Sequence, residues 1–204
     1  MLRIGILAST KGTDMHAIID AISSKKLKAL ISVVISNKKD SYALERARNN
    51  NINAVFIESK GMEREAYDNK VSKELDKSKA DLILLIGWMR ILSPWFVRKY
   101  KNKIINIHPS LLPAFAGGMD ADVHRKVLEA GCKVTGCTLH FVDESIDSGA
   151  IIMQKAVEIA QDETSGSLKE KVQKAEQEII LEALGLFSKE KIKKNLKKSI
   201  LQKN

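Results

Sequence analysis

An asparagine and a histidine two residues apart form the sharpest chemical pattern in the chain. Asn106 and His108 stand at the end of an apolar segment, and Pro109 and Pro113 stiffen the loop that follows. Side chains two apart on a strand point to the same face, so the amide and the imidazole are expected side by side. A hydrogen-bond donor beside a ring that titrates near neutral pH suits an oxyanion formed in acyl-type transfer.

An acidic turn at residues 143–149 is a second candidate for chemistry. It contains Asp143, Glu144 and Asp147. Such a turn is usually only solvated. If it folds back against His108, a carboxylate would instead favour the imidazolium form of that ring. The sequence leaves both interpretations open.

A loop with one glycine and several hydroxyl groups, residues 9–14 (STKGTD), joins the first predicted strand to the first predicted helix. Backbone N–H groups at a helix start, next to a flexible glycine, make an anion site. The loop matches neither the dinucleotide fingerprint nor the P-loop, so nothing supports NAD or ATP. A phosphate site and an ordinary strand-to-helix turn remain alternatives. Thr13 or Asp14 is expected to cap the helix.

Alternating strand and helix patterns must position these segments. Strands are predicted over residues 2–8, 29–35, 54–57, 82–86, 103–107, 133–142 and 150–159, and helices over residues 15–22, 41–50, 62–78, 122–130 and 167–187, with a short one from Pro94. This order predicts an α/β fold: a Rossmann-like, open, mostly parallel twisted sheet with helices on both faces. The short separation of the last two strands predicts an antiparallel edge hairpin. Ligands of such sheets bind beyond the carboxyl ends of the strands.

The basic character of the chain is concentrated at its end. Of the formal charge of +9, seven lysines against one glutamate in residues 189–204 account for +6, which leaves +3 for 188 residues. We therefore predict one domain over residues 1–188 and a basic tail over residues 189–204. Ile192, Leu196 and Ile200 give this tail the spacing of an amphipathic helix, expected to dock on the domain.

Composition indicates an ordinary soluble globular protein, with 44% hydrophobic and 29% charged residues. No apolar run approaches the ~18 residues of a membrane span, and the start lacks a secretory signal. Two cysteines are too few for a disulfide framework. The cytoplasm is the expected compartment.

The other histidines receive structural interpretations. His16 and His124 fall on predicted helices and are expected at the surface or partly packed. His140 is expected to be structural or a neighbour of the site rather than a base.

Three long segments resemble the folate-dependent phosphoribosylglycinamide formyltransferase family, and the similarity runs from about residue 3 to residue 187. Its most specific parts are residues 87–94 (GWMRILSP), 106–113 (NIHPSLLP) and 134–147 (VTGCTLHFVDESID). They occur in the order and at the separations typical of that family.

The resemblance implies an enzyme that passes a formyl group from 10-formyltetrahydrofolate to the amine of glycinamide ribonucleotide in de novo purine biosynthesis, with no metal. By position it assigns catalysis to Asn106, His108 and Asp147. It assigns the phosphate and ribonucleotide to Gly12, Thr13, Asp14, Pro109, Gln173 and Glu176. It assigns the folate to Arg64, Met89, Arg90, Ile91, Leu92, Asp143 and Glu144. Small molecules are the implied partners, with no nucleic acid or membrane, for a monomer or homodimer.

Two departures from the family pattern concern ligand binding. Asp14 stands where the family often has asparagine, and an aspartate near a phosphate is unfavourable unless its side chain points away. Lys11 offers compensating charge. Residues 114–120 also lack a proline that commonly follows the aromatic residue, which affects the expected shape of that loop.

Two rival functions remain. A formyltetrahydrofolate deformylase would use a similar asparagine, histidine and aspartate, but carries an extra N-terminal regulatory domain for which this chain has no expected room. A basic nucleic-acid-binding protein would spread basic and aromatic residues over one face, whereas here the charge lies mainly in the tail.

Overall fold

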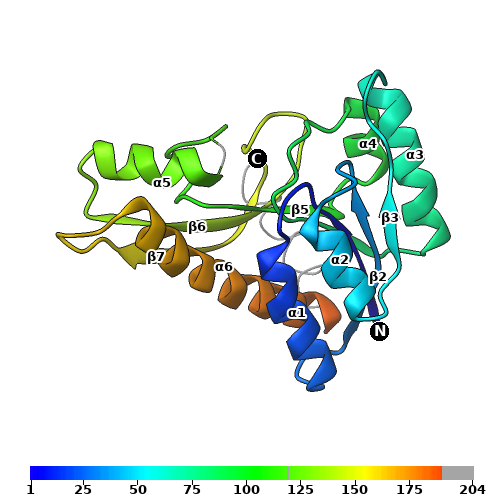
Figure 1. Ribbon diagram of the computed structural model, residues 1–204, viewed down its shortest axis with the longest axis horizontal. Helices are drawn as coiled ribbons and strands as arrows, with labels where there is room; N and C mark the ends of the chain where they lie inside the picture. Colours follow the sequence, from blue (N-terminus) through cyan, green and yellow to red (C-terminus); the bar gives the residue numbers. More distant parts are fainter. Residues whose placement is uncertain (119, 190–204) are drawn as a thin grey trace, which may run out of the picture.

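Seven strands form one twisted sheet in the computed structural model, which describes residues 1–118 and 120–189 (Figure 1). The strands are β1 (Leu2–Leu7), β2 (Ala29–Ser36), β3 (Ala54–Phe56), β4 (Leu82–Leu85), β5 (Ile104–His108), β6 (Val134–Phe141) and β7 (Ile151–Glu158). Their order in the sheet is β3-β2-β1-β4-β5-β6-β7. The first five pair in parallel, while β6 runs antiparallel to both β5 and β7. The predicted α/β class, mostly parallel sheet and antiparallel edge hairpin are confirmed.

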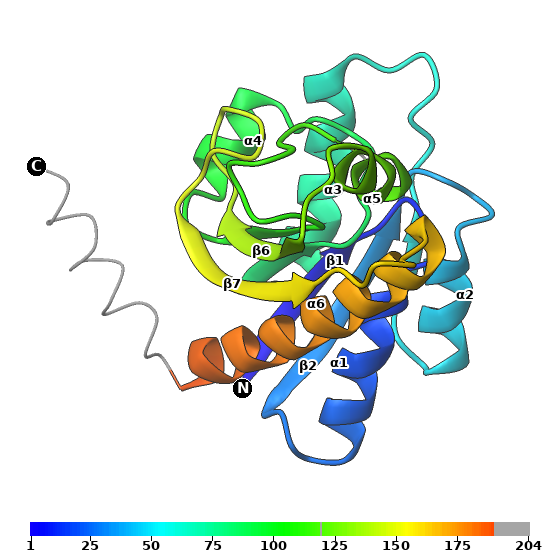
Figure 2. The same cartoon turned by 90° about the vertical axis from the view of Figure 1, so that its left-hand side faces the viewer.

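Helices cover both faces of this sheet (Figures 1 and 2). They are α1 (Thr13–Ser23), α2 (Tyr42–Asn49), α3 (Arg64–Lys77), α4 (Pro94–Lys99), α5 (Asp120–Glu129) and α6 (Ser165–Ser188). One hydrophobic core joins the sheet to α1, α2, α5 and α6, and a second joins it to α3 and α4. Successive residues of β4 enter opposite cores, as the period of a strand requires: Leu82 and Leu84 enter the first, Ile83 and Leu85 the second. All four are buried, so this central strand carries a continuous apolar run.

The start of α1 differs from the prediction. Gly12, and neither Thr13 nor Asp14, is the N-cap residue, and no side chain caps the helix by a hydrogen bond. Gly12 has φ 58°, a left-handed conformation that glycine adopts without steric cost. A side chain there would also meet Ala43, because its Cβ would lie 2.8 Å from that of Ala43. The prediction of a side-chain cap was therefore wrong. The residues of this helix start, Gly12, Thr13 and Asp14, line a cavity.

The prediction for one helical histidine was also wrong. His124 is only 2% exposed, because it lies beside Val123 and Val127 on the part of α5 that packs against the sheet and α6. His16 is exposed on α1 as expected, with its ring near Asp20.

The basic tail predicted over residues 189–204, with Ile192, Leu196 and Ile200, lies outside the described residues apart from Lys189. The boundary between domain and tail therefore stays a prediction. Within the described residues both cysteines are free thiols. None of the described helices combines the length and apolar character needed to cross a bilayer.

Candidate active site

One cavity of about 930 Å³ opens at the carboxyl edge of the parallel strands. Its walls come mainly from the loop between β1 and α1, the segment after β4, the end of β5, the turn between β6 and β7, and one face of α6. Single residues of α2 and α4, Arg46 and Val97, and the glycines at 117 and 118 add to the lining. Its volume falls within the usual range of ligand-binding clefts, and its position is the one expected for an open α/β sheet.

The three residues proposed for catalysis meet in this cavity. Asn106 and His108 project from β5, with His108 only 3% exposed. Asp147 lies in the turn between β6 and β7, and its Oδ2 is 3.3 Å from Nδ1 of His108. Asp147 adopts a left-handed conformation with φ 51°, which aspartate tolerates better than most residues. The turn therefore folds back on the imidazole, the arrangement that the sequence left open.

The loop after β5 also contacts this group. Nε2 of His108 lies 3.1 Å from the carbonyl oxygen of Phe115, and the N–H of Gly117 donates to Oδ2 of Asp147 at 2.9 Å. Both ring nitrogens of His108 thus face oxygen acceptors, so a doubly protonated ring would donate at both. A ligand can reach Nε2 only when the Phe115 carbonyl has moved away from it.

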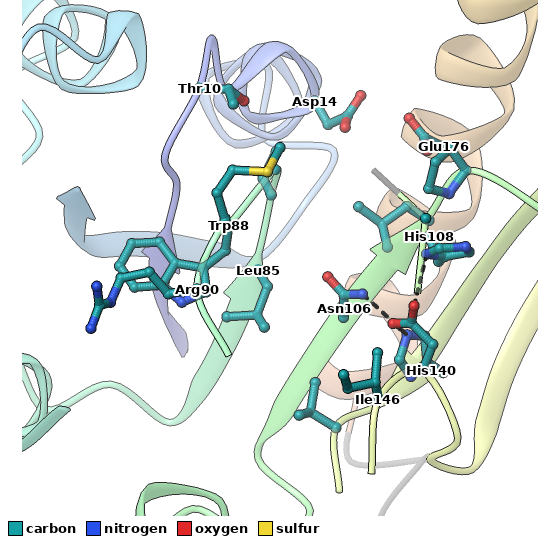
Figure 3. Close-up of a pocket in the computed structure, with 18 of the residues that line it drawn as sticks. Thr10, Asp14, Leu85, Trp88, Arg90, Asn106, His108, His140, Ile146 and Glu176 are labelled. Atoms are coloured by element: carbon teal, nitrogen blue, oxygen red, sulfur yellow. Dashed lines mark hydrogen bonds and ion pairs between the residues drawn. The ribbon is translucent and has the colours of Figure 1, made fainter. Parts of the chain in front are cut away.

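His140 fixes the orientation of the Asn106 amide (Figure 3). It pairs with Asn106 across β5 and β6, and its Nδ1 lies 2.9 Å from the carbonyl oxygen of Phe141. A carbonyl only accepts, so Nδ1 carries the proton and donates. Nε2 of the neutral ring then accepts from Nδ2 of Asn106 at 3.1 Å. This uses one N–H of the amide and leaves the second for a ligand.

The charge state of His140 follows from its surroundings. Burial lowers the pKa of His140 below its usual 6.5, and neighbouring His108 lowers it further, although the Phe141 carbonyl and Asp147 oppose this shift. The ring is therefore neutral near pH 7. Its Nε2 lies 3.6 Å from Oδ1 of Asp147, too far for a hydrogen bond, so we treat this contact as packing rather than as an ion pair.

The lowered pKa of His140 predicts a pH dependence of stability. Between the unfolded pKa near 6.5 and the lower folded value, the unfolded chain binds the proton more readily, so stability falls as the pH falls through this window. We expect His140→Gln to reduce this loss. Urea unfolding at pH 7.5 and 5.5 measures it, with His16→Gln as the control at an exposed ring. Equal acid destabilisation of the wild type and His140→Gln would contradict the assignment.

The loop at residues 9–14 is cross-linked to the neighbouring strand ends. The hydroxyl of Ser9 donates to Asn37 at 2.7 Å and accepts from the N–H of Met89 at 2.9 Å. Thr10 packs so closely against Gly87 that a Cβ there would lie 2.4 Å from its Oγ1. Gly87 also has φ 57°, a left-handed conformation. Both the close approach of Thr10 and this backbone conformation therefore favour glycine at this position. These contacts fix the loop at the edge of the cavity.

The residues expected to hold the ribonucleotide all line the cavity: Gly12, Thr13, Asp14, Pro109, Gln173 and Glu176. Asp14 and Glu176 are buried carboxylates, and both lie near enough to Cys137 to contribute to the raised pKa of its thiol, after burial itself. Asp14 lines the cavity together with the residues expected to hold the phosphate. It is therefore close to the expected phosphate site.

The residues expected to hold the folate line the same cavity, with one exception. Met89, Arg90, Ile91, Leu92, Asp143 and Glu144 all line the cavity. Met89 and Ile91 are exposed apolar side chains there. Arg64 is the exception. It begins α3 and is exposed, outside the residues that line the cavity.

An aromatic and charged cluster supports the segment after β4. The guanidinium of Arg90 lies 4.3 Å from the ring centroid of Tyr67, which stacks on Trp88 at 6.3 Å. Asp68 accepts a hydrogen bond from the N–H of Ser93 at 2.6 Å, and burial raises the pKa of Asp68 despite this bond. The segment is thereby anchored to α3.

Sequence patterns miss three charged residues that line the cavity: Arg46, Lys169 and Glu170. Lys169 and Glu170 precede Gln173 by four and three residues on α6, so the helical period could have indicated them. No comparable signal exists for Arg46 on α2.

The residues that the structure describes contain no group of three or more histidines, cysteines or acids able to hold a metal ion.

Comparison with known proteins supplies the family. A sequence profile described as formyl transferase matches residues 2–184. The phosphoribosylglycinamide formyltransferase of Escherichia coli is 37% identical over 193 residues, covering 94% of this chain and 90% of that protein. The crystal structure of glycinamide ribonucleotide transformylase 1 from Symbiobacterium toebii has a TM-score of 0.88 at 38% identity, covering 93% of this chain and 88% of that one.

A longer relative is also similar. The trifunctional purine biosynthetic protein adenosine-3 of Drosophila melanogaster is 42% identical over 188 residues, which are 91% of this chain. This chain spans only 14% of the length of that relative. The profile match over residues 2–184, with the similar enzymes and fold, places the chain in the formyl transferase family.

Proposed function

We propose that this protein transfers the formyl group of 10-formyltetrahydrofolate to the amine of glycinamide ribonucleotide in de novo purine biosynthesis. One observation carries the proposal. Asn106, His108 and Asp147 lie in the same cavity as both the loop at residues 10–14 and the segment at residues 89–92. Two ligands can therefore meet at the catalytic group, as a transfer reaction requires.

The amide and the imidazole are suited to stabilise the negative charge of a transfer intermediate. When the acceptor amine adds to the formyl carbon, the formyl oxygen becomes an oxyanion. The second N–H of Asn106 is free to donate to it, because the first is held by His140. His108 donates through Nε2 once the Phe115 carbonyl has given way. Such donors, fixed in advance, act mainly on the transition state.

Asp147 completes the mechanism through His108. Its carboxylate lies 3.3 Å from Nδ1 and is mostly buried, which stabilises a positive charge on the ring. The attacking nitrogen must lose a proton and the leaving folate nitrogen must gain one. We assign this proton movement to Asp147 and His108, with water as the expected carrier.

The formyl donor is a folate co-substrate, the other partner is a small phosphorylated amine, and no metal takes part. We propose a cytoplasmic enzyme, a monomer or homodimer, without nucleic-acid or membrane partners.

The assay that tests the proposal uses purified protein and 10-formyltetrahydrofolate, with and without glycinamide ribonucleotide. We expect release of tetrahydrofolate only when the ribonucleotide is present, with one formylglycinamide ribonucleotide formed for each folate released. Equal folate release without the acceptor would instead indicate a deformylase. No reaction under either condition would contradict the proposal.

A further inference from the structure

Arg46 lies on the same wall of the cavity as the loop at residues 9–14. The hydroxyl of Ser41 donates to the carbonyl oxygen of Thr10 at 2.8 Å, and the N–H of Ala43 donates to the same oxygen at 3.3 Å. The backbone of Gly12 packs against Ala43. The first turn of α2 is thus built against the loop. Arg46 follows one turn later and lines the same cavity as residues 10–14.

The side chain of Arg46 is held in place, and no acidic residue in the described part of the chain pairs with it. Long side chains on a helix lean toward its N-terminus. The guanidinium accordingly lies 5.1 Å from the ring centroid of Tyr42, four residues earlier. Its Nε is buried and has no hydrogen-bond partner. Within the described part of the chain, no aspartate or glutamate forms an ion pair with it.

The charged residues that line the cavity with the loop at residues 9–14 indicate a role for Arg46 in binding an anion. Three basic side chains, Lys11, Arg46 and Lys169, line it together with the acids Asp14, Glu170 and Glu176. Asp14 and Glu176 are buried, so their effect on a nearby anion is weakly screened. A fixed positive charge would stabilise a phosphate beside the loop, in addition to the N–H groups of the helix start. Lys11 is exposed, whereas Arg46 is partly buried and packed on an aromatic ring.

We propose that Arg46 binds the phosphate of the acceptor and sets the preference of the enzyme for a phosphorylated amine over its dephosphorylated form. The planar guanidinium can donate two parallel hydrogen bonds to phosphate oxygens, a geometry that lysine lacks. The inference rests on the proposed function for the identity of the acceptor, but the phosphate contact itself is testable without catalysis.

The kinetic test compares glycinamide ribonucleotide with glycinamide riboside, which lacks the phosphate. We expect Arg46→Gln to raise KM for the ribonucleotide about 10- to 100-fold, the effect typical of losing a hydrogen bond to a charged group. We expect its kcat/KM for the riboside, and its KM for 10-formyltetrahydrofolate, to stay within about twofold of the wild-type values. Arg46→Lys keeps the positive charge but loses the planar group that donates two parallel hydrogen bonds. It should give an intermediate KM for the ribonucleotide.

Arg48→Gln is the matched control, since Arg48 is exposed on the same helix and lies outside the cavity lining. It should leave both acceptors unaffected. An equal loss of kcat/KM for the ribonucleotide and the riboside would assign Arg46 a purely structural role on Tyr42 and overturn the inference. An unchanged KM for the ribonucleotide would overturn it too. If the thermal midpoint shows that Arg46→Gln does not fold, the kinetics of Arg46→Lys with the ribonucleotide and the riboside are compared instead.

A binding measurement separates this inference from the proposed function. We expect ³¹P NMR titration with inorganic phosphate to show binding to the wild type and to Arg48→Gln, and at least about tenfold weaker binding to Arg46→Gln. Equal binding by all three proteins would overturn the role of Arg46 even if formyl transfer occurs. Absence of formyl transfer by the wild type would contradict the proposed function, and the phosphate titration would still decide the role of Arg46.

Discussion

Replacing His108 by asparagine is expected to lower kcat about 100- to 1,000-fold, the usual effect of removing one oxyanion donor. The asparagine amide can still donate to Asp147, which lies 3.3 Å from the Nδ1 that it replaces. It cannot reach the position of Nε2 and cannot become positively charged at neutral pH. The loss should therefore appear in kcat more than in KM. Steady-state kinetics with both substrates measures it.

His16→Asn is the control for His108→Asn, because it makes the same chemical change at an exposed ring on α1. Its kcat should match that of the wild type. Thermal unfolding of His108→Asn must show a folded protein for the comparison to count. A folded variant with wild-type kcat would remove His108 from the mechanism.

Asp147→Asn is expected to lower kcat by about 100-fold or more, within the range for groups that assist proton transfer. Asparagine keeps the size of the side chain and tolerates the left-handed conformation at φ 51°, so the turn should be preserved. It lacks the negative charge that stabilises a protonated His108 beside it.

Asp162→Asn serves as the comparison for Asp147→Asn, since Asp162 is exposed in the segment before α6 and does not line the cavity. Single-turnover measurement of formyl transfer separates the chemical step from product release. An Asp147→Asn protein that is folded and transfers the formyl group at the wild-type rate would exclude proton movement through this carboxylate.

The fold was predictable because its signals are local. The continuous apolar run of β4 predicts a strand covered on both faces, and each of its residues enters a core. The apolar stripes of α1 and α6 predict which sides of these helices face the sheet. The start of α1 was not predictable in this way. Its cap depends on a left-handed glycine packed against a residue from α2, a contact about 30 positions away in sequence.

The site was only partly predictable, for the same reason. The shared face of Asn106 and His108 follows from the period of a strand, and the structure places both in the cavity. The closure of Asp147 on His108 depends on the path of a turn with a left-handed residue, which no periodicity encodes. The place of Arg46 depends on how α2 packs on a distant loop. Arg64 is the opposite case. The resemblance to the family assigns it to the folate, but it is not among the residues that line the cavity.

The contacts of Phe115 and Gly117 with His108 and Asp147 have a consequence for affinity. In this conformation the protein's own backbone competes with the substrates for the catalytic hydrogen bonds. A dissociation constant measured for a ligand that uses Nε2 of His108 is then the intrinsic constant divided by the fraction of molecules whose loop has released the ring. A sequence change that alters only the release of this loop would change apparent affinity and turnover without touching either substrate.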